Sequence, residues 1–192
     1  MRIIAGEHRG RTLKTPDGRG TRPTDARARE ALFNILGERV VGATFLDMYA
    51  GSGSVGLEAL SRGAASCLFV EQNAGATSVI KENVRLCGYA GLARVWHNTT
   101  RAALKRLEET NEGFAIVFAD PPFLRGEAEL SDLCTRLKNR PQLVHNDTER
   151  RGTLVIQHHW KAHPSFAPDS PFTAVMERRA GESALSFYNP ES

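Results

Sequence analysis

The sequence has few cysteines and no long apolar run. Its 192 residues include three cysteines, Cys67, Cys87 and Cys134, which lie far apart, form no C-x-x-C pair and fall within apolar patterns. They predict core packing in a reducing compartment and argue against a metal site. The apolar stretch FAIVFA, residues 114–119, is far shorter than the roughly 20 residues of a membrane-spanning helix. The first residues, MRIIAGEHRGR, also lack a signal-peptide segment, so we expect a cytoplasmic protein with no membrane contact.

Internal repeats and low-complexity blocks are also missing. With 41% hydrophobic residues, the chain is long enough for one well-buried core and short for two, which predicts a single main domain. Two short segments, RIIA at 2–5 and RTLKT at 11–15, predict a small hairpin before a loop that contains Pro and Gly. We therefore divide the chain into a basic hairpin extension at 1–20 and a main domain at 21–192.

The net charge is only +3, but it is unevenly distributed. Residues 1–29 carry eight Lys or Arg and three Asp or Glu side chains, a net charge of +5, so the remaining chain sums to −2. Such a segment is either a solvated basic tail or an arm that binds phosphates, because Arg pairs bidentately with phosphate oxygens and clustered cations release counterions on binding. Composition alone leaves both interpretations open.

From residue 43 onward, short apolar strands alternate with amphipathic helices. The expected strands are 43–48, 66–71, 93–98, 114–119, 152–157, 172–178 and 183–189. Helices are expected from Thr24 to Gly37, at 54–63, from Asn73 to Cys87, at 99–109, and around Leu130 to Leu137. The alternation predicts an α/β fold with right-handed crossovers, a mostly parallel sheet and helices on both faces. The short AGE connection at 180–182 predicts an antiparallel hairpin at one edge of the sheet.

A glycine pattern follows the first strand of this series. Gly51, Gly53 and Gly56 form G-x-G-x-x-G between a strand and a helix, where missing side chains let a ligand approach the backbone at the helix N-terminus. Glu71 lies 20 residues after Gly51 at the end of the next strand, where a carboxylate can accept both hydroxyl protons of a ribose. Together they predict a nucleoside-containing cofactor, either NAD or S-adenosylmethionine. The lack of G-K-[ST] disfavours a P-loop nucleotide site.

Two further features favour S-adenosylmethionine. Asp47, four residues before Gly51, ends its strand with a carboxylate that suits a cationic amino-acid group and would repel a pyrophosphate. The other feature is the loop after the fourth strand, Asp120-Pro121-Pro122-Phe123. Each has a purely structural alternative, since Asp47 can cap the turn and the prolines can simply end the strand.

The chemistry of the four loop residues suits a planar amine. The Asp120 carboxylate can accept a hydrogen bond from an exocyclic amine. Pro121 restricts Asp120 to an extended geometry and leaves its own carbonyl as a second acceptor. Two acceptors hold the amine so that its nitrogen lone pair points toward a sulfonium methyl group, and Phe123 offers a ring on which the base can stack. The loop therefore predicts a clamp for a nucleobase.

Taken with the N-terminal segments, these motifs resemble the bacterial methyltransferase family that modifies the exocyclic N2 amine of one guanine in small-subunit (16S) ribosomal RNA. The resemblance rests on RIIAGEHRGRTLKTP, RPTDARAREALFNIL, LDMYAGSGSVGLEALSRGA, FVE and ADPPF, and it covers most of residues 1–135. It implies a Rossmann-like class I methyltransferase fold that uses S-adenosylmethionine, with a seven-stranded sheet, an antiparallel last strand and an N-terminal hairpin extension. The implied partner is 16S rRNA within the 30S subunit or its assembly intermediate, and we expect a monomer.

The resemblance also assigns roles to residues of this chain. The methionine end of the cofactor is expected at Asp47, Tyr49, Gly51, Ser52 and Gly53, the ribose at Glu71, and the adenine at Asn98 and Thr99. The catalytic clamp for the target amine is Asp120, Pro121, Pro122 and Phe123. RNA phosphates are expected at Arg9, Arg11, Arg22, Arg27 and Arg29.

The chain departs from the expected pattern at two places. Many methyltransferases have aspartate where this chain has Asn98, whose amide oxygen can still accept from the adenine amine. Gln157-His158-His159 falls where an acidic residue is expected after the fifth strand, and we predict that these histidines lie at the surface.

Three other functions fit part of the pattern. The four loop residues specify a planar amine and not guanine, so methylation of an adenine or cytosine amine in DNA stays open. An NAD-dependent oxidoreductase would use the glycines and Glu71 but leaves the Asp-Pro-Pro-Phe loop unexplained. A non-catalytic RNA-binding assembly factor with a vestigial cofactor pocket would bind RNA without methyl transfer.

Overall fold

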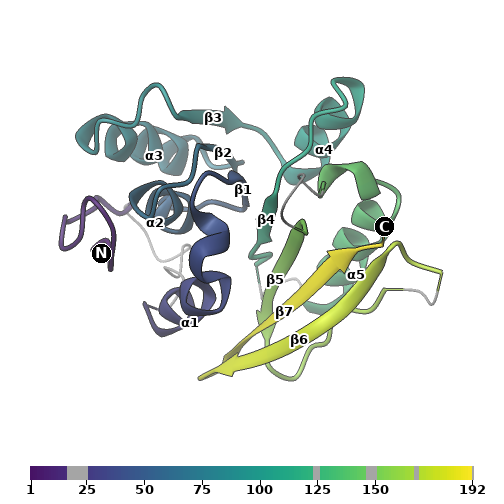
Figure 1. Ribbon diagram of the computed structural model, residues 1–192. Coiled ribbons are helices and arrows are strands. Elements are labelled where there is room, and N and C mark those ends of the chain that lie inside the picture. Colours follow the sequence, from purple (N-terminus) through teal and green to yellow (C-terminus); the bar gives the residue numbers. More distant parts are fainter. Residues whose placement is uncertain (17–25, 123–125, 146–150, 167–168, 192) are drawn as a thin grey trace.

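The computed structural model has a seven-stranded sheet at its centre, with helices on both sides (Figure 1). It describes residues 1–16, 26–122, 126–145, 151–166 and 169–191. The strands are β1 (Thr44–Met48), β2 (Ser66–Glu71), β3 (Ala93–His97), β4 (Ile116–Ala119), β5 (Thr153–His159), β6 (Phe172–Ala180) and β7 (Ser183–Pro190). Their order across the sheet is β3-β2-β1-β4-β5-β7-β6.

The strands from β3 to β5 are parallel, whereas β7 runs antiparallel to both of its neighbours, β5 and β6. β4, in the middle, is buried along its whole length, as expected for a parallel strand covered on both faces. β6 and β7 are joined by a tight turn in which Gly181 has a φ of 66°, a left-handed conformation that glycine adopts without strain. The α/β class, the mostly parallel sheet and the predicted antiparallel hairpin are all confirmed.

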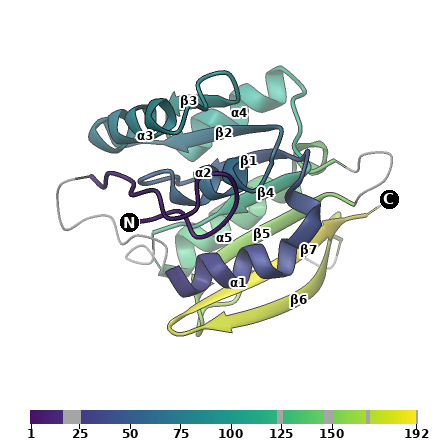
Figure 2. The ribbon, with the colours of Figure 1, turned by 60° about the vertical axis from the view of Figure 1, so that its left-hand side comes forward.

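Two layers of helices enclose the sheet (Figure 2). The helices are α1 (Ala26–Leu36), α2 (Ser54–Ser61), α3 (Ala74–Leu86), α4 (Thr100–Glu109) and α5 (Gly126–Lys138), with short 3₁₀ segments η1 (Gly37–Val40) and η3 (Pro141–Leu143). α1, α2 and α3 pack on one face, where α1 crosses β6 and β7, and α4 and α5 pack on the other. The helices predicted at 54–63, 73–87 and 99–109 agree with α2, α3 and α4, whereas the predicted start at Thr24 lies outside the described residues.

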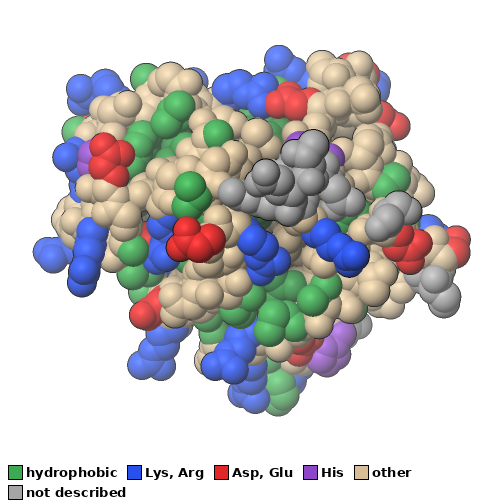
Figure 3. Space-filling view, in the orientation of Figure 1, with side chains coloured by type: hydrophobic (Ala, Val, Ile, Leu, Met, Phe, Trp, Pro, Cys, Tyr) green, Lys and Arg blue, Asp and Glu red, His purple; other side chains and the backbone are tan. Residues whose placement is uncertain are grey.

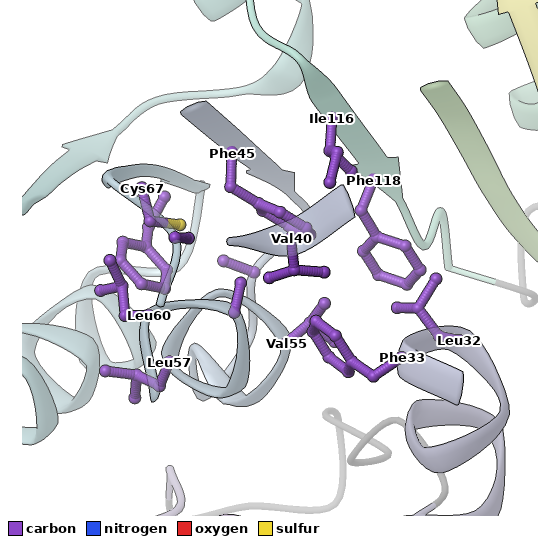
Figure 4. Packing of buried hydrophobic residues seen from close by; sticks show 14 of the residues in the cluster. Leu32, Phe33, Val40, Phe45, Val55, Leu57, Leu60, Cys67, Ile116 and Phe118 are labelled. Carbon is purple, nitrogen blue, oxygen red and sulfur yellow. The ribbon is translucent and has the colours of Figure 1, made fainter. Parts of the chain in front are cut away.

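The core under α1 and α2 fixes both helices against the sheet (Figure 4). Leu32 and Phe33 of α1 meet Phe45 of β1 and Phe118 of β4, and all four side chains are fully buried. The rings of Phe33 and Phe45 lie 6.4 Å apart. Burying one such side chain stabilises the fold by roughly 1.5–3 kcal/mol. This packing therefore also fixes the start of α2, where the glycine pattern lies.

α1 and α2 run in the same direction. Arg29 Nε lies 3.8 Å from Glu58 Oε2, and the Arg62 guanidinium lies 4.9 Å from the centre of the Phe33 ring, so successive turns of the two helices meet. We call the end of the sheet where β1 to β5 finish its carboxyl end, and the opposite end its amino end. Since α2 leads from the carboxyl end of β1 to the amino end of β2, both helices begin near the carboxyl end.

The N-terminal residues 1–13 pack near the amino end of the sheet. The predicted hairpin is present as an antiparallel bridge between Arg2 and Thr12. Ile3 N–H donates to the Arg11 carbonyl at 3.0 Å, and Leu13 N–H donates to the Met1 carbonyl at 2.8 Å. The backbone N–H groups of Ile4 and Ala5 donate to the Glu58 carboxylate of α2, at 2.7 and 2.9 Å, so the hairpin is also held against the helix.

The fourth strand is shorter than expected, and the cysteines are placed as expected. The strand predicted at 114–119 is shorter, because Ala115 N–H donates to Thr44 Oγ1 (3.0 Å) and Phe114 bridges to Val144 before the parallel ladder begins. The three cysteines are buried and not in disulfides, which confirms core packing. Among the described residues, the helices are too short or too polar to cross a membrane.

Candidate cofactor and nucleobase site

Three carboxylates gather at the carboxyl end of the sheet. Asp47 and Glu71 close β1 and β2, and Asp120 directly follows β4. Each comes two residues after a phenylalanine of the core cluster under α1, α2 and α3, namely Phe45, Phe69 and Phe118. Because residues two apart in a strand point to the same face, all three carboxylates lie on this face, beside the start of α2. The sequence motifs thus meet at one place.

The loop between β1 and α2 needs its glycines for different reasons. Gly51 and Gly53 have φ of 55° and 77°, and Gly53 forms the N-cap of α2. At Gly56 a side chain would not fit, because its Cβ would lie 2.4 Å from the Phe69 ring and 2.5 Å from Cys67 Sγ. The first two glycines therefore shape the turn, and the third lets α2 pack closely on β2. Together they hold the first backbone N–H groups of α2 over the carboxyl end of the sheet, where a polar ligand can approach them.

Glu71 connects the glycine loop to the start of α3. Its Oε2 accepts from Gly51 N–H at 2.8 Å and its Oε1 from Asn73 N–H at 2.7 Å. The side chain is almost fully buried, but a carboxylate has about four acceptor positions, and these bonds use only two of them. The orientation of Glu71 is therefore fixed before any ligand binds, and its contact with a ribose stays a prediction.

Asp47 is a buried carboxylate with an unusual proton affinity. Its Oδ2 accepts from Gly56 N–H at 2.9 Å, and only 1% of the residue is exposed. Burial raises the pKa of Asp47 to about 7, the Gly56 hydrogen bond lowers it, and the charges of Asp120 and Glu71 raise it further. No Lys or Arg among the described residues forms an ion pair with it. A cationic ligand group at this end of β1 would supply the missing countercharge.

The other residues expected to bind the cofactor are distributed around this loop. Ser52 is buried, and its carbonyl accepts from Asn83 Nδ2 at 3.2 Å. Asn98 N–H donates to the Glu71 carbonyl at 3.0 Å, so Asn98 lies beside the predicted ribose position. Thr99 is the N-cap of α4, where its hydroxyl oxygen accepts from Ala102 N–H at 3.2 Å. The contacts of Asn98 and Thr99 with an adenine stay predictions.

Tyr49 turns toward α5. It has a φ of 62°, an unusual conformation for a residue with a side chain, and its hydroxyl donates to Glu129 Oε1 at 3.3 Å. Burial raises the pKa of this hydroxyl, so it stays protonated and able to donate. The ring packs against the cluster under α4 and α5, so Tyr49 has a structural role of its own. Its contact with a cofactor stays a prediction.

The loop after β4 begins one strand away from Asp47. Asp47 pairs with Phe118, so Asp120 lies on the neighbouring strand and two residues further, about 7 Å along the strand direction. Asp120 is partly exposed, Pro121 is buried and Pro122 is exposed. Phe123 lies outside the described residues. The predicted clamp therefore begins one strand away from the carboxylate expected to meet the methionine end of the cofactor.

The end of β5 differs from expectation. His158 was predicted to lie at the surface, but it is only 2% exposed and its Nε2 bonds Ser186 Oγ at 2.8 Å. Burial lowers the pKa of His158, so the neutral ring is favoured. Gln157 is also buried, and its Oε1 has no hydrogen-bond partner among the described residues. Since Ala119 pairs with Ile156, Gln157 lies level with Asp120.

One arginine expected to bind RNA is instead part of the core. Arg29 is only 1% exposed, and its guanidinium donates to the Arg2 carbonyl at 2.7 Å and lies near the Glu58 carboxylate. Desolvation lowers the pKa of Arg29, and the Glu58 charge partly offsets this. The prediction that Arg29 contacts RNA phosphates was wrong, because its positive charge is used inside the fold. Net charge along the chain does not distinguish a buried arginine from an exposed one.

The remaining N-terminal arginines lie in different places. Arg9 and Arg11 are exposed in the segment that packs on the ends of α2 and α3; Arg11 donates to the Leu86 carbonyl, at the amino end. Arg27 is exposed near the start of α1, close to the carboxyl end, and Arg22 lies outside the described residues. On the face seen in Figure 3, Lys and Arg side chains are spread over several elements, with Asp and Glu between them.

Sequence reasoning missed two buried polar residues that join the N-terminal segment to the helices. Asn83 of α3 donates from Nδ2 to the carbonyls of Lys14 (3.0 Å) and Ser52 (3.2 Å), and so joins the N-terminal segment to the glycine loop. Glu58 of α2 accepts from the N-terminal backbone. The signal was present in the sequence, since each polar residue interrupts an apolar helical face and must find partners when buried.

The chain is similar to several known proteins along most of its length. A family model described as "Conserved hypothetical protein 95" matches residues 1–189. A putative rRNA methyltransferase YlbH of Bacillus subtilis is 36% identical over 158 residues, 82% of each chain. Ribosomal RNA small subunit methyltransferase D of Escherichia coli (strain K12) is 44% identical over 129 residues, 67% of this chain and 63% of that protein.

Solved structures agree with this result. The putative methyltransferase yhhF from Escherichia coli superposes with a TM-score of 0.77 at 34% identity, covering 100% of this chain and 98% of that one. Sheet order, glycine loop and sequence similarity thus point to one group of proteins. The chain belongs to the family described as Conserved hypothetical protein 95, the family of ribosomal RNA small subunit methyltransferase D.

Proposed function

We propose that this protein transfers a methyl group from S-adenosylmethionine to the exocyclic N2 amine of one guanine in 16S ribosomal RNA. The substrate is the 30S subunit or a late assembly intermediate, met in the cytoplasm by a monomeric enzyme. Family membership supports the rRNA methyltransferase class, and the resemblance in the N-terminal and Asp-Pro-Pro-Phe segments supports guanine N2 as the acceptor.

One observation carries this proposal. The loop that begins at Asp120 starts one strand from Asp47 and about 7 Å further along the sheet, on the same face. A cofactor whose cationic methionine end meets Asp47 would therefore present its methyl group near Asp120. An amine held by Asp120 and the Pro121 carbonyl would meet that methyl group in line.

The residues of the chain fit this cofactor. Asp47 is buried without an ion-pair partner among the described residues, and a cationic group would stabilise its ionised form. Glu71 is held in place by two backbone N–H donors and has acceptor positions left for ribose hydroxyls. When bound, S-adenosylmethionine supplies an electrophilic methyl group, whose S–C bond breaks with its electron pair passing to sulfur as the new N–C bond forms.

In the proposed mechanism, the chain mainly orients the acceptor. Asp120 and the Pro121 carbonyl each accept a hydrogen bond from one of the two amine N–H groups. These bonds keep the nitrogen lone pair from delocalising into the base and direct it at the methyl carbon. Asp120 also stabilises the positive charge that develops on nitrogen. After transfer, the amine proton passes to Asp120 or to water. The guanine must leave its stack to enter this loop, which favours a single-stranded or bulged RNA site.

The proposal is tested by methyl acceptance from radiolabelled S-adenosylmethionine. Small subunits from cells lacking this enzyme, naked 16S rRNA and duplex DNA would be compared, and the labelled nucleoside identified by mass spectrometry. We expect label in N2-methylguanosine, mapped to a single position in small subunits. Label in an adenine or cytosine amine of DNA would support the DNA alternative. RNA binding without label would support the assembly factor.

A further inference from the structure

The two tryptophans of the chain lie at opposite parts of the sheet and each stacks with arginine. Trp96 of β3 packs against the core cluster under α4 and α5, and the Arg106 guanidinium lies 4.1 Å from its ring centre. Trp160 directly follows β5, and the Arg179 guanidinium of β6 lies 4.0 Å from its ring centre. Trp160 is not part of either core cluster. Its stack with Arg179 therefore has no evident role in the core.

The position of Trp160 relates it to the nucleobase loop. Ile156 of β5 pairs with Ala119 of β4, so Trp160 lies four residues beyond the level of Ala119, about 13 Å along the strand direction. Asp120 follows Ala119 on the adjacent strand. Trp160 thus extends past the carboxyl end of the sheet, the end at which the proposed target site begins. A few nucleotides next to a guanine held by Asp120 would span this distance.

The stack is held in place by the β6–β7 hairpin. Trp160 N–H donates to the Glu182 carbonyl at 3.1 Å, and Arg179 Nε donates to the Gly181 carbonyl at 3.0 Å. Lys161 adds a second cation, with Nζ 5.3 Å from the Trp160 ring centre. In Figure 3, Lys and Arg side chains project from the lower end of the molecule, where Figure 1 shows the tip of this hairpin. Ring and guanidinium are thus ordered before a partner binds.

We propose that Trp160, Lys161 and Arg179 form a contact site for single-stranded RNA beside the target guanine. Arginine planes and aromatic rings stack on nucleobases, and lysine pairs with the phosphates between them. The proposal rests on the proposed function and adds a site outside the N-terminal arginines. The acidic residues nearby are Glu177 and Glu182; Glu177 lies two residues before Arg179 and on the same face of β6, but its carboxylate has partners of its own, because it lies 3.5 Å from His163 Nδ1 and accepts from Ser186 Oγ.

The first test uses tryptophan fluorescence, since the chain has only two tryptophans. The Trp96→Phe variant reports on Trp160 alone, and the matched Trp160→Phe variant reports on Trp96 alone. Each would be titrated with a single-stranded 12-nucleotide RNA of mixed sequence and with the same RNA as a duplex. We expect saturable quenching of Trp160 by the single strand and little change at Trp96. Quenching that is absent at Trp160, or equal at both rings, would overturn the site.

The second test compares two matched arginines. Arg179→Ala and Arg106→Ala each remove an exposed guanidinium that lies over a tryptophan. We expect Arg179→Ala to raise the KM for small subunits about 5- to 100-fold, and Arg106→Ala to change it less than about twofold. Lys161→Ala should reduce the salt dependence of RNA binding by about 0.7 in the slope of log K against log salt. Equal increases in KM for the two arginine variants would overturn the site, because they would indicate only a general loss of positive charge.

The outcomes separate this inference from the proposed function. The parent protein can methylate small subunits while RNA leaves Trp160 unquenched and Arg179→Ala leaves the KM unchanged. That result would refute the RNA site and leave the proposed function intact. Quenching of Trp160 by single-stranded RNA without methylation of any RNA supports the site and contradicts the function.

Discussion

Two buried carboxylates, Glu58 of α2 and Asp47 of β1, lie in opposite circumstances. Glu58 accepts from Ile4 N–H, Ala5 N–H and Arg62 Nε at 2.7 to 2.9 Å, and Arg29 lies beside it. At the carboxyl end, Asp47 has one backbone donor and no described ion-pair partner, and its pKa is raised to about 7. The satisfied carboxylate holds two chain segments together. The unsatisfied one is suited to bind a cation.

Arginines show the same contrast. Arg29 at the N-terminal segment is buried and stabilises the fold, whereas Arg179 at the hairpin tip is exposed over a tryptophan. Both belong to Arg-containing stretches of sequence. Their roles differ because a guanidinium can bind RNA only if it reaches solvent. We therefore expect substitutions at the carboxyl end of the sheet to change activity and those in the Arg29–Glu58 pair to change stability.

The largest effect is expected for Asp120→Ala. Removing the acceptor that orients the amine and stabilises its developing charge should lower kcat by about a thousandfold or more. Affinity for S-adenosylmethionine, measured by isothermal titration calorimetry, should stay within about threefold, because the cofactor is bound mainly at the ends of β1 and β2. Asp120→Asn is the matched control: it keeps one acceptor oxygen and should retain more activity. Equal losses of turnover and of cofactor affinity would contradict the assigned role.

Glu58→Ala should cost about 3–5 kcal/mol of stability, because it leaves Arg29 buried without its acidic partner and two backbone donors unsatisfied. The free energy of unfolding would be measured by urea denaturation. Glu58→Gln, which keeps acceptor oxygen but loses the charge, should lose less. At a temperature where the variant is folded, kcat should be close to that of the parent protein. A variant of unchanged stability but lowered kcat would contradict the comparison between the two carboxylates.

The protonation of Asp47 should make the stability of the protein depend on pH. A folded-state pKa of about 7, above the usual 3.8, means that the native state holds a proton that the unfolded state releases. Its contribution to stability therefore falls as pH rises from about 4 to 7, by roughly 3 kcal/mol. Asp47→Asn should flatten this part of the pH profile and be more stable than the parent protein at pH 8. Denaturation curves across pH 4–8 would measure both.

Binding of the cofactor should also depend on the protonation state of Asp47. A cationic ligand group favours ionised Asp47, so binding of S-adenosylmethionine near pH 6 should release a proton, and affinity should rise with pH up to about 7. Calorimetry in two buffers of different ionisation enthalpy measures the released proton. The contact between Asp47 and the cofactor would be contradicted if the parent protein released no proton on binding, or if the Asp47→Asn variant still released one.

The smallest effect is expected for Arg9→Ala. Arg9 is exposed near the amino end, away from the nucleobase loop, so it can contact only RNA that extends around the molecule. We expect the KM for small subunits to change by less than about twofold, which is the scale of one peripheral phosphate contact at physiological salt. A larger effect than that of Arg179→Ala, measured in the same assay, would move the main RNA surface to the N-terminal segment.

Much of the fold could be predicted from local pattern. The strands at 66–71 and 183–189 agree with β2 and β7 within a residue, because apolar alternation and glycine turns are read from neighbouring residues. The hairpin at 2–15 was predicted too, but its attachment to α2 was not, because Ile4 and Ala5 N–H donate to Glu58, more than 50 residues away. His158 was misjudged for a similar reason, since β7 covers it.

The sequence by itself determined the class of the sheet, the glycine loop and the chemistry available after β4, because each depends on residues close together in the chain. Only the tertiary structure decided which charges are usable. Arg29 and Glu58 neutralise each other inside the fold, Asp47 is buried without such a partner, and Arg179 meets Trp160 across a hairpin. The reason is physical: the free energy of a charge depends on its burial and on its neighbours in space, and neither follows from its position in the sequence.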